Sequence, residues 1–179
     1  MKRWQNPCMR PATLSPACLL LLLMLGRPLP AAAVDDFVGS ISVLGPPNRE
    51  LFDGAQSLER GDFVRGVALT QAGLKSPGVS RDDRAAGECN LCAGYAALRN
   101  WDLALAHCVA SIELNPDNWR TYNNRAAAYV GRGELDKALA DVETGLGLAP
   151  HSDTLKRSLQ IVLDHRRVSR EKAQRARKV

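Results

Sequence analysis

Apolar residues recur at three- and four-residue intervals through the middle of the chain, which is the spacing expected of amphipathic helices. The first such run contains Leu91, Cys92, Tyr95 and Leu98, and the second contains Leu103, Ala104, Cys108 and Ile112. The sequence RNW at 99–101 lies between the two runs, where we expect the turn. The pattern therefore predicts two antiparallel helices joined by a tight turn.

The same pattern repeats along the chain with an offset of 34 residues. Laying 85–118 over 119–152 aligns Tyr95 with Tyr129, Ala104 with Ala138, Leu105 with Leu139 and Pro116 with Pro150. Each proline follows a second helix, which it cannot continue. A fainter copy covers about 47–80, where RGDF at 60–63 resembles RGEL at 132–135, and a capping helix is expected over 152–167. A period of this length is typical of helical repeat proteins.

The repeat resembles the tetratricopeptide repeat. In the third unit the matching residues are Tyr122, Ala126, Tyr129, Ala138, Val142, Gly145 and Pro150; in the second they are Leu91, Cys92, Tyr95, Ala104, Cys108, Ser111 and Pro116. Arg125 stands where the family pattern has Leu, and the first unit has Ser57 and Gly66 where the family has Tyr and Ala. The resemblance implies an all-α fold, a short right-handed solenoid of antiparallel helix pairs, with a repeat domain over 47–167.

The resemblance also implies a function, because such arrays hold a protein or peptide segment on the concave face formed by the first helix of each unit. Transferring the groove positions gives Leu51, Ala55, Cys89, Ala93, Ala96, Arg120, Asn123, Asn124, Ala127, Arg157 and Ile161. We expect Asn123 and Asn124 to hydrogen-bond an extended backbone, and Arg120 and Arg157 to accept a carboxylate. The family's carboxylate-binding set of Lys and Asn is incomplete, and neither a cofactor nor catalytic activity is expected.

The N-terminus has the pattern of a secretory signal peptide over residues 1–33. Lys2, Arg3 and Arg10 precede the short apolar run at 17–25, and small residues at 31–33 suit a cleavage site. The run is shorter than the roughly 20 residues that span a bilayer. We therefore expect an exported protein, periplasmic or secreted, with a linker over 34–46.

Charge is uneven in the remaining chain, whose 20 basic and 19 acidic residues nearly balance. Nine Lys or Arg lie within 156–179, against two acids there. The tail at 168–179 is expected to be a solvated end or helix extension, with weak contact to an anionic surface as the alternative. Nucleic acid is not an expected partner, because the tail has no aromatic residue for stacking.

Three cysteines remain after removal of the signal peptide, two of them in the CxxC spacing of Cys89 and Cys92. Packing of small apolar thiols is the preferred interpretation. The alternatives are a redox pair, a zinc site that includes His107 and Cys108, and a disulfide, for which Cys92 with Cys108 is the preferred pairing.

The leading hypothesis is an exported scaffold that binds a partner segment in the groove. One alternative is a thiol redox or disulfide-handling protein that uses Cys89 and Cys92. Another is a self-associating structural repeat protein, which would form a homo-oligomer. Catalysis by other groups has little support, since the histidines at 107, 151 and 165 match no metalloprotease spacing.

Overall fold

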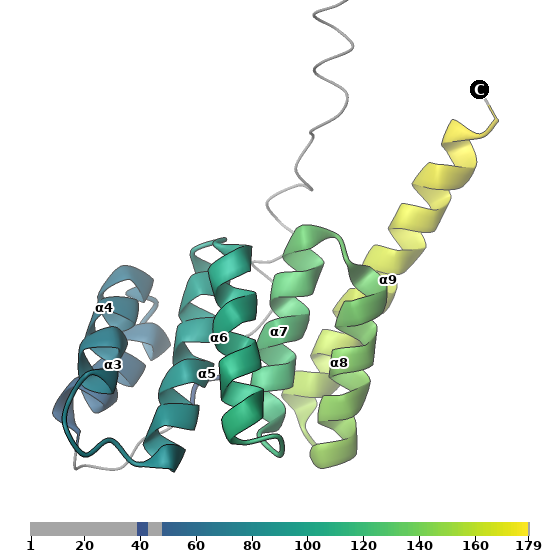
Figure 1. Cartoon of the computed structure of the whole chain (residues 1–179). Coiled ribbons are helices and arrows are strands. Elements are labelled where there is room, and N and C mark those ends of the chain that lie inside the picture. The colour runs from purple at the N-terminus through teal and green to yellow at the C-terminus, as the bar shows by residue number, and fades with distance from the viewer. Residues whose placement is uncertain (1–38, 43–47, 179) are drawn as a thin grey trace, which may run out of the picture.

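The computed structural model describes residues 39–42 and 48–178, and the regular secondary structure of that part of the chain is all α-helix. The helices are α3 (Arg49–Glu59), α4 (Phe63–Leu74), α5 (Arg81–Ala97), α6 (Trp101–Leu114), α7 (Trp119–Arg132), α8 (Leu135–Leu148) and α9 (Asp153–Ala176). They form antiparallel pairs stacked side by side, with α3 and α4 at one end and α9 at the other (Figure 1). The prediction of an all-α helical solenoid is confirmed.

Short polar residues begin most of these helices. The side chains of Asn48, Asp62, Ser80, Asn100, Asn118 and Ser152 each accept a hydrogen bond from a backbone N–H in the first turn. Such caps satisfy N–H groups that have no partner within the helix. At the other end of α7, Gly133 has φ 77°, a left-handed conformation that glycine adopts without strain. The RGEL sequence at 132–135 therefore forms the turn between α7 and α8.

Small residues set the distance between the helices. Cys92, Ala104, Ala126 and Ala138 are fully buried. At Gly94 an added Cβ would lie 2.6 Å from Cγ2 of Val67. The close approach of α5 to α4 therefore requires the absence of a side chain at 94, as the small positions of the repeat predicted for its contacts.

The C-terminal helix is longer than expected. The capping helix was placed at 152–167 and a separate tail at 168–179, but α9 continues to Ala176. Its second half extends past the stacked helices (Figure 1). Most of the basic tail is therefore a helical extension with exposed side chains.

The cysteines are not three packing thiols, so the preferred interpretation was wrong for two of them. Cys92 on α5 forms a disulfide with Cys108 on α6, while Cys89 is free and buried. The alternative pairing of Cys92 with Cys108 is the one found. The bond joins the two helices of one repeat unit.

The family departure at Arg125 also has a structural explanation. Its guanidinium makes two hydrogen bonds to the carboxylate of Asp141 on α8, at 2.8 and 2.7 Å. The pair joins α7 to α8 through charge rather than through apolar contact. Among the described helices, none combines the length and apolarity that crossing a membrane requires.

Candidate functional site: an occupied groove

A short segment of the chain itself, residues 39–42, lies in the groove formed by α5 and α7. We call it the groove segment. Asn124 on α7 holds both backbone groups of Ser40: its Oδ1 accepts from the Ser40 N–H and its Nδ2 donates to the Ser40 carbonyl, each at 2.8 Å. Asn90 on α5 holds Ser42 in the same way, at 2.8 and 3.1 Å. Two asparagines thus bind the backbone of alternate residues.

This arrangement of asparagines is selective for an extended backbone. One amide side chain can pair with both the N–H and the C=O of a residue only when the two groups point to the same side, as they do in an extended chain. Residues two apart in an extended chain present these groups on the same edge. Asn90 and Asn124 are 34 residues apart, so the same position in successive repeat units supplies both contacts.

The side chains of the groove segment alternate between two environments. Ser40 Oγ accepts from Nδ2 of Asn123 at 3.1 Å, and Ser42 Oγ accepts from Nδ2 of Asn118 at 3.3 Å. Ile41 instead packs against the buried cluster of Leu58, Val67 and Leu91. The serines face α7 and the isoleucine faces the first repeat unit.

The groove segment is buried as tightly as a core element. Ser40 and Ser42 are 7% and 9% exposed, and Asn90, Asn123 and Asn124 are 0–1% exposed. Across the described residues every buried side-chain nitrogen or oxygen has a hydrogen-bond partner. Some of these hydrogen bonds depend on the groove segment, because both Oδ1 and Nδ2 of Asn90 pair with the backbone of Ser42.

Cys89 lies directly beneath this segment. Its Sγ is 3.9 Å from the Ser40 carbonyl oxygen and 3.5 Å from Nδ2 of Asn124. Complete burial raises the pKa of the Cys89 thiol, and hydrogen bonds from Ser42, Thr121 and Asn124 with the charge of Arg120 only partly oppose this. A redox CxxC needs an accessible thiolate, and Cys92 is already bonded to Cys108. The geometry does not suit the predicted alternative of a redox pair.

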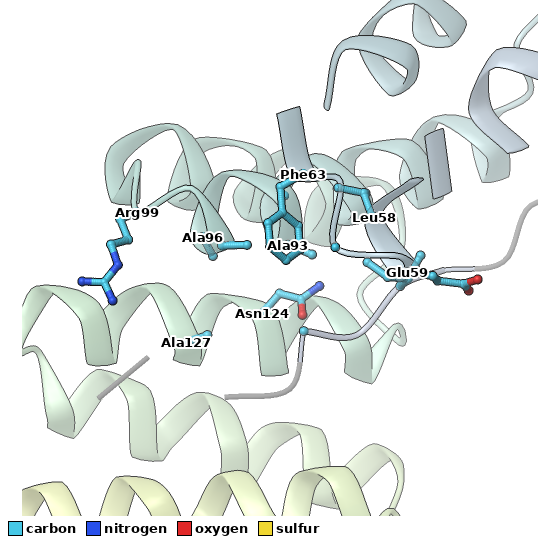
Figure 2. Close-up of a pocket in the computed structure, with 13 residues that line it drawn as sticks. Leu58, Glu59, Phe63, Ala93, Ala96, Arg99, Asn124 and Ala127 are labelled. Atoms are coloured by element: carbon cyan, nitrogen blue, oxygen red, sulfur yellow. The ribbon is translucent and has the colours of Figure 1, made fainter. Parts of the chain in front are cut away.

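An open cavity of about 600 Å³ adjoins the segment at Gly39 and Ile41. Its walls are mostly apolar or small and include Leu58, Phe63, Ala93, Ala96 and Ala127. Figure 2 shows Ala93 and Ala96 on one side of this space and Ala127 on the other, with Asn124 between them. The groove therefore has unfilled apolar space beside its occupied part.

The structure brings together six of the eleven predicted groove residues: Cys89, Ala93, Ala96, Asn123, Asn124 and Ala127. They contact the groove segment or line the adjoining cavity. The expectation that Asn124 binds an extended backbone agrees with this geometry, although the backbone belongs to the chain itself. Asn123 donates a hydrogen bond to the side chain of Ser40.

The other five predicted groove residues have different surroundings. Leu51 and Ala55 are buried, and Leu51 is in the interface with Gly73 of α4. Arg120 stacks over the ring of Trp119 at 4.6 Å. Ile161 packs against the core between α7 and α9. Arg157 is exposed on α9.

Three contributing residues were not predicted: Asn90, Asn118 and Ser158. Ser158 Oγ donates to Oδ1 of Asn123 at 2.7 Å and so orients that amide. Two of the three had a detectable signal, since Asn90, Asn124 and Ser158 are spaced by 34 residues. Asn118 was hidden because it is also the N-cap of α7.

The zinc alternative is also contradicted by the side-chain contacts. His107 Nδ1 lies 2.7 Å from a carboxylate oxygen of Glu88, and its ring stacks on Tyr95 with the centroids 5.3 Å apart. Cys108 is held in the disulfide. Over residues 39–42 and 48–178, no group of three or more His, Cys, Asp or Glu side chains is placed to hold a metal ion.

Comparison with known proteins agrees with the repeat. Residues 107–140 match the tetratricopeptide repeat family. Mouse sperm-associated antigen 1 is 27% identical over 117 residues, which are 64% of this chain and 12% of that protein. The wheat Hsp70-Hsp90 organizing protein is 36% identical over 70 residues, 39% of this chain and 12% of that protein. The chain thus spans only about an eighth of either relative.

Solved structures show the same fold. The second tetratricopeptide domain of human RPAP3, determined in complex with an HSP70 peptide, superposes with a TM-score of 0.53 at 22% identity. The match covers 63% of this chain and 91% of that domain. The helical solenoid of this chain is therefore the fold of tetratricopeptide repeat domains.

Proposed function

We propose that the protein is an exported, non-catalytic tetratricopeptide repeat scaffold that binds an extended segment of a partner protein in the groove between α5 and α7. The observation that carries the proposal is the pair of asparagines, Asn90 and Asn124, that grip an extended backbone at alternate residues. Main-chain hydrogen bonds of this kind supply affinity, and the surroundings of alternate side chains supply specificity.

The relatives support a peptide-binding role. The domain of RPAP3 was solved with an HSP70 peptide, and the wheat relative is named for organizing Hsp70 and Hsp90. In the groove of this chain, the side chains that hydrogen-bond to residues 39–42 include four asparagines and Cys89. We therefore propose that backbone amides, not a terminal carboxylate, are the main recognition element.

Export rests on two observations. The first is the signal-peptide pattern of residues 1–33, which lie outside the described residues. The second is the Cys92–Cys108 disulfide, a bond that persists in oxidising compartments and is rare where thiols are kept reduced. An exported location accounts for both.

Affinity capture with the exported chain and its Asn124→Ala variant tests the proposal. Proteins that bind in the groove should be recovered with the wild-type chain and reduced with the variant, because the variant lacks both backbone contacts at one position. Thr144→Ala, an exposed residue of α8, is the matched control. Equal recovery with wild type and Asn124→Ala would reject the groove.

A cysteine variant separates the scaffold from the redox alternative. Cys89→Ser should leave captured proteins unchanged if the protein is a scaffold. Thiol chemistry would instead be favoured if the wild-type chain captured proteins as mixed disulfides with Cys89 and the variant no longer captured them.

A further inference from the structure

We propose that the groove segment, residues 39–42, is a resident ligand of the groove, and that partner segments with the same small–apolar–small order compete with it for Asn90 and Asn124. The inference rests on the proposed function, because it names the layout of the segment that the scaffold would accept. It also adds a step, since the resident segment has to leave before a partner enters.

The layout follows from the contacts. Small side chains are required at the first and third positions, where Ser40 and Ser42 are 7% and 9% exposed against α7. An apolar side chain is required between them, where Ile41 packs on the cluster of Leu58, Val67 and Leu91. A segment with a long or charged residue at either outer position would clash with the groove or bury an unpaired charge.

The groove itself demands an occupant of this kind. Without residues 39–42 the amide of Asn90 would lose both of its partners, Ser42 N–H and Ser42 C=O. Buried amides without partners are costly. Without the groove segment, Asn90 and Asn124 would therefore have to bind water or another extended backbone. Water would satisfy the amides but would leave the apolar site of Ile41 unfilled.

The contacts are also of a kind that can be released. The groove segment is joined to the helices by side-chain hydrogen bonds and one apolar residue, whereas each helix is held by its own backbone ladder and core. Removing the segment breaks no helical hydrogen bond. The cavity at Gly39 and Ile41 gives an incoming chain apolar space to enter first.

Cys89 reports whether the segment is in place. Its thiol is fully buried and lies under the Ser40 carbonyl, so reagents reach it only when the segment leaves. We would measure maleimide modification of Cys89 by peptide mass spectrometry in the wild type and in Ile41→Asp, which buries a charge at the apolar position. Val64→Asp is the matched control, because Val64 is 69% exposed on α4.

Modification of Cys89 should be about tenfold faster or more in Ile41→Asp and unchanged in Val64→Asp. Ser40→Pro is a second route to release that leaves the apolar cluster intact, because it removes the N–H that Asn124 accepts. Circular dichroism should show the wild-type helix content in both variants. Unchanged modification in both release variants would overturn the proposal.

A peptide in trans tests competition. The synthetic peptide FVGSISVL, residues 37–44, should restore protection of Cys89 in Ser40→Pro and should fail to do so when Asn124→Ala is added. A peptide with both serines replaced by lysine should give no protection. Protection by the lysine peptide, or no protection by the native one at millimolar concentration, would contradict the proposed layout.

Two further results separate this inference from the proposed function. Capture of groove-dependent partners should increase in Ser40→Pro; equal capture by wild type and Ser40→Pro would leave the scaffold standing but show that the segment does not compete. Protection of Cys89 in the wild type should not change on dilution. Protection lost on dilution would mean that a second copy supplies the segment, which would overturn the assignment to the same chain.

Discussion

Replacing Arg125 by leucine should destabilise the protein even though leucine is the residue that the repeat family has at this position. Arg125 makes a bidentate pair with Asp141, and the two side chains are 21% and 8% exposed. Leucine would leave the carboxylate of Asp141 buried without its partner. A leucine that merely restored an apolar contact would have the opposite effect.

The size of the effect follows from the burial of the pair. Breaking a fully buried pair by removing one partner costs about 3–5 kcal/mol, and exposed pairs contribute about 0–1 kcal/mol. Arg125 is 21% exposed, so we expect the free energy of unfolding to fall by about 2–3 kcal/mol. The melting temperature should fall by about 6–9 °C for a chain of this length.

Urea denaturation followed by circular dichroism measures the change, with the m-value checking that the transition stays two-state. Arg125→Leu/Asp141→Leu should be more stable than the sum of the two single variants predicts, by about 1–3 kcal/mol, because the double variant leaves no unpaired charge. Lys156→Leu, whose partner Asp153 is 92% exposed, should change stability by less than about 0.5 kcal/mol. A neutral or stabilising Arg125→Leu would refute the reasoning.

Three more predictions concern α5. Gly94→Ala should lower stability by about 1–3 kcal/mol in urea denaturation, since the new Cβ would lie 2.6 Å from Val67; an unchanged midpoint would contradict the close packing. Replacing Cys92 and Cys108 by Ala should cost about 3 kcal/mol for a loop of 16 residues, with little effect if the bond is absent in solution. Burial raises the pKa of Cys89 above its ordinary value of 9.0. Below pH 9.0 the thiol is protonated in both the folded and the unfolded state and does not affect stability; above pH 9.0 the unfolded thiol ionises first, so the free energy of unfolding falls. Cys89→Ala should remove this part of the fall in the urea midpoint at high pH.

The repeat could be predicted from sequence because its signal is periodic. An offset of 34 residues, with small residues at the helix contacts, defined two helix pairs. The resemblance to the tetratricopeptide repeat then implied that Asn124 and Ala127 lie in the groove. The same offset applied to Asn124 would have found Asn90. The cysteines of CxxC drew attention to Cys89 instead, although its thiol is buried beneath the groove segment.

The groove segment itself could not be predicted in this way. It contains four residues without a period, and its contact between Ser40 and Asn124 joins residues 84 apart in sequence. Helical periodicity reports which face of a helix is apolar, but it does not report what covers a polar groove. Leu51 illustrates a related limit, because its side chain packs on Gly73 of α4, whereas Leu58 of the same helix packs against Ile41.

The two cysteines of the CxxC motif have separate roles in the fold. Cys92 joins α5 to α6 through its bond to Cys108, which removes it from exchange with Cys89. Cys89 keeps its thiol because the groove segment covers it and burial raises its pKa. An exported protein with a free cysteine is exposed to mispairing. Occupation of the groove by residues 39–42 covers this thiol, so the proposed exchange of that segment for a partner would also expose Cys89.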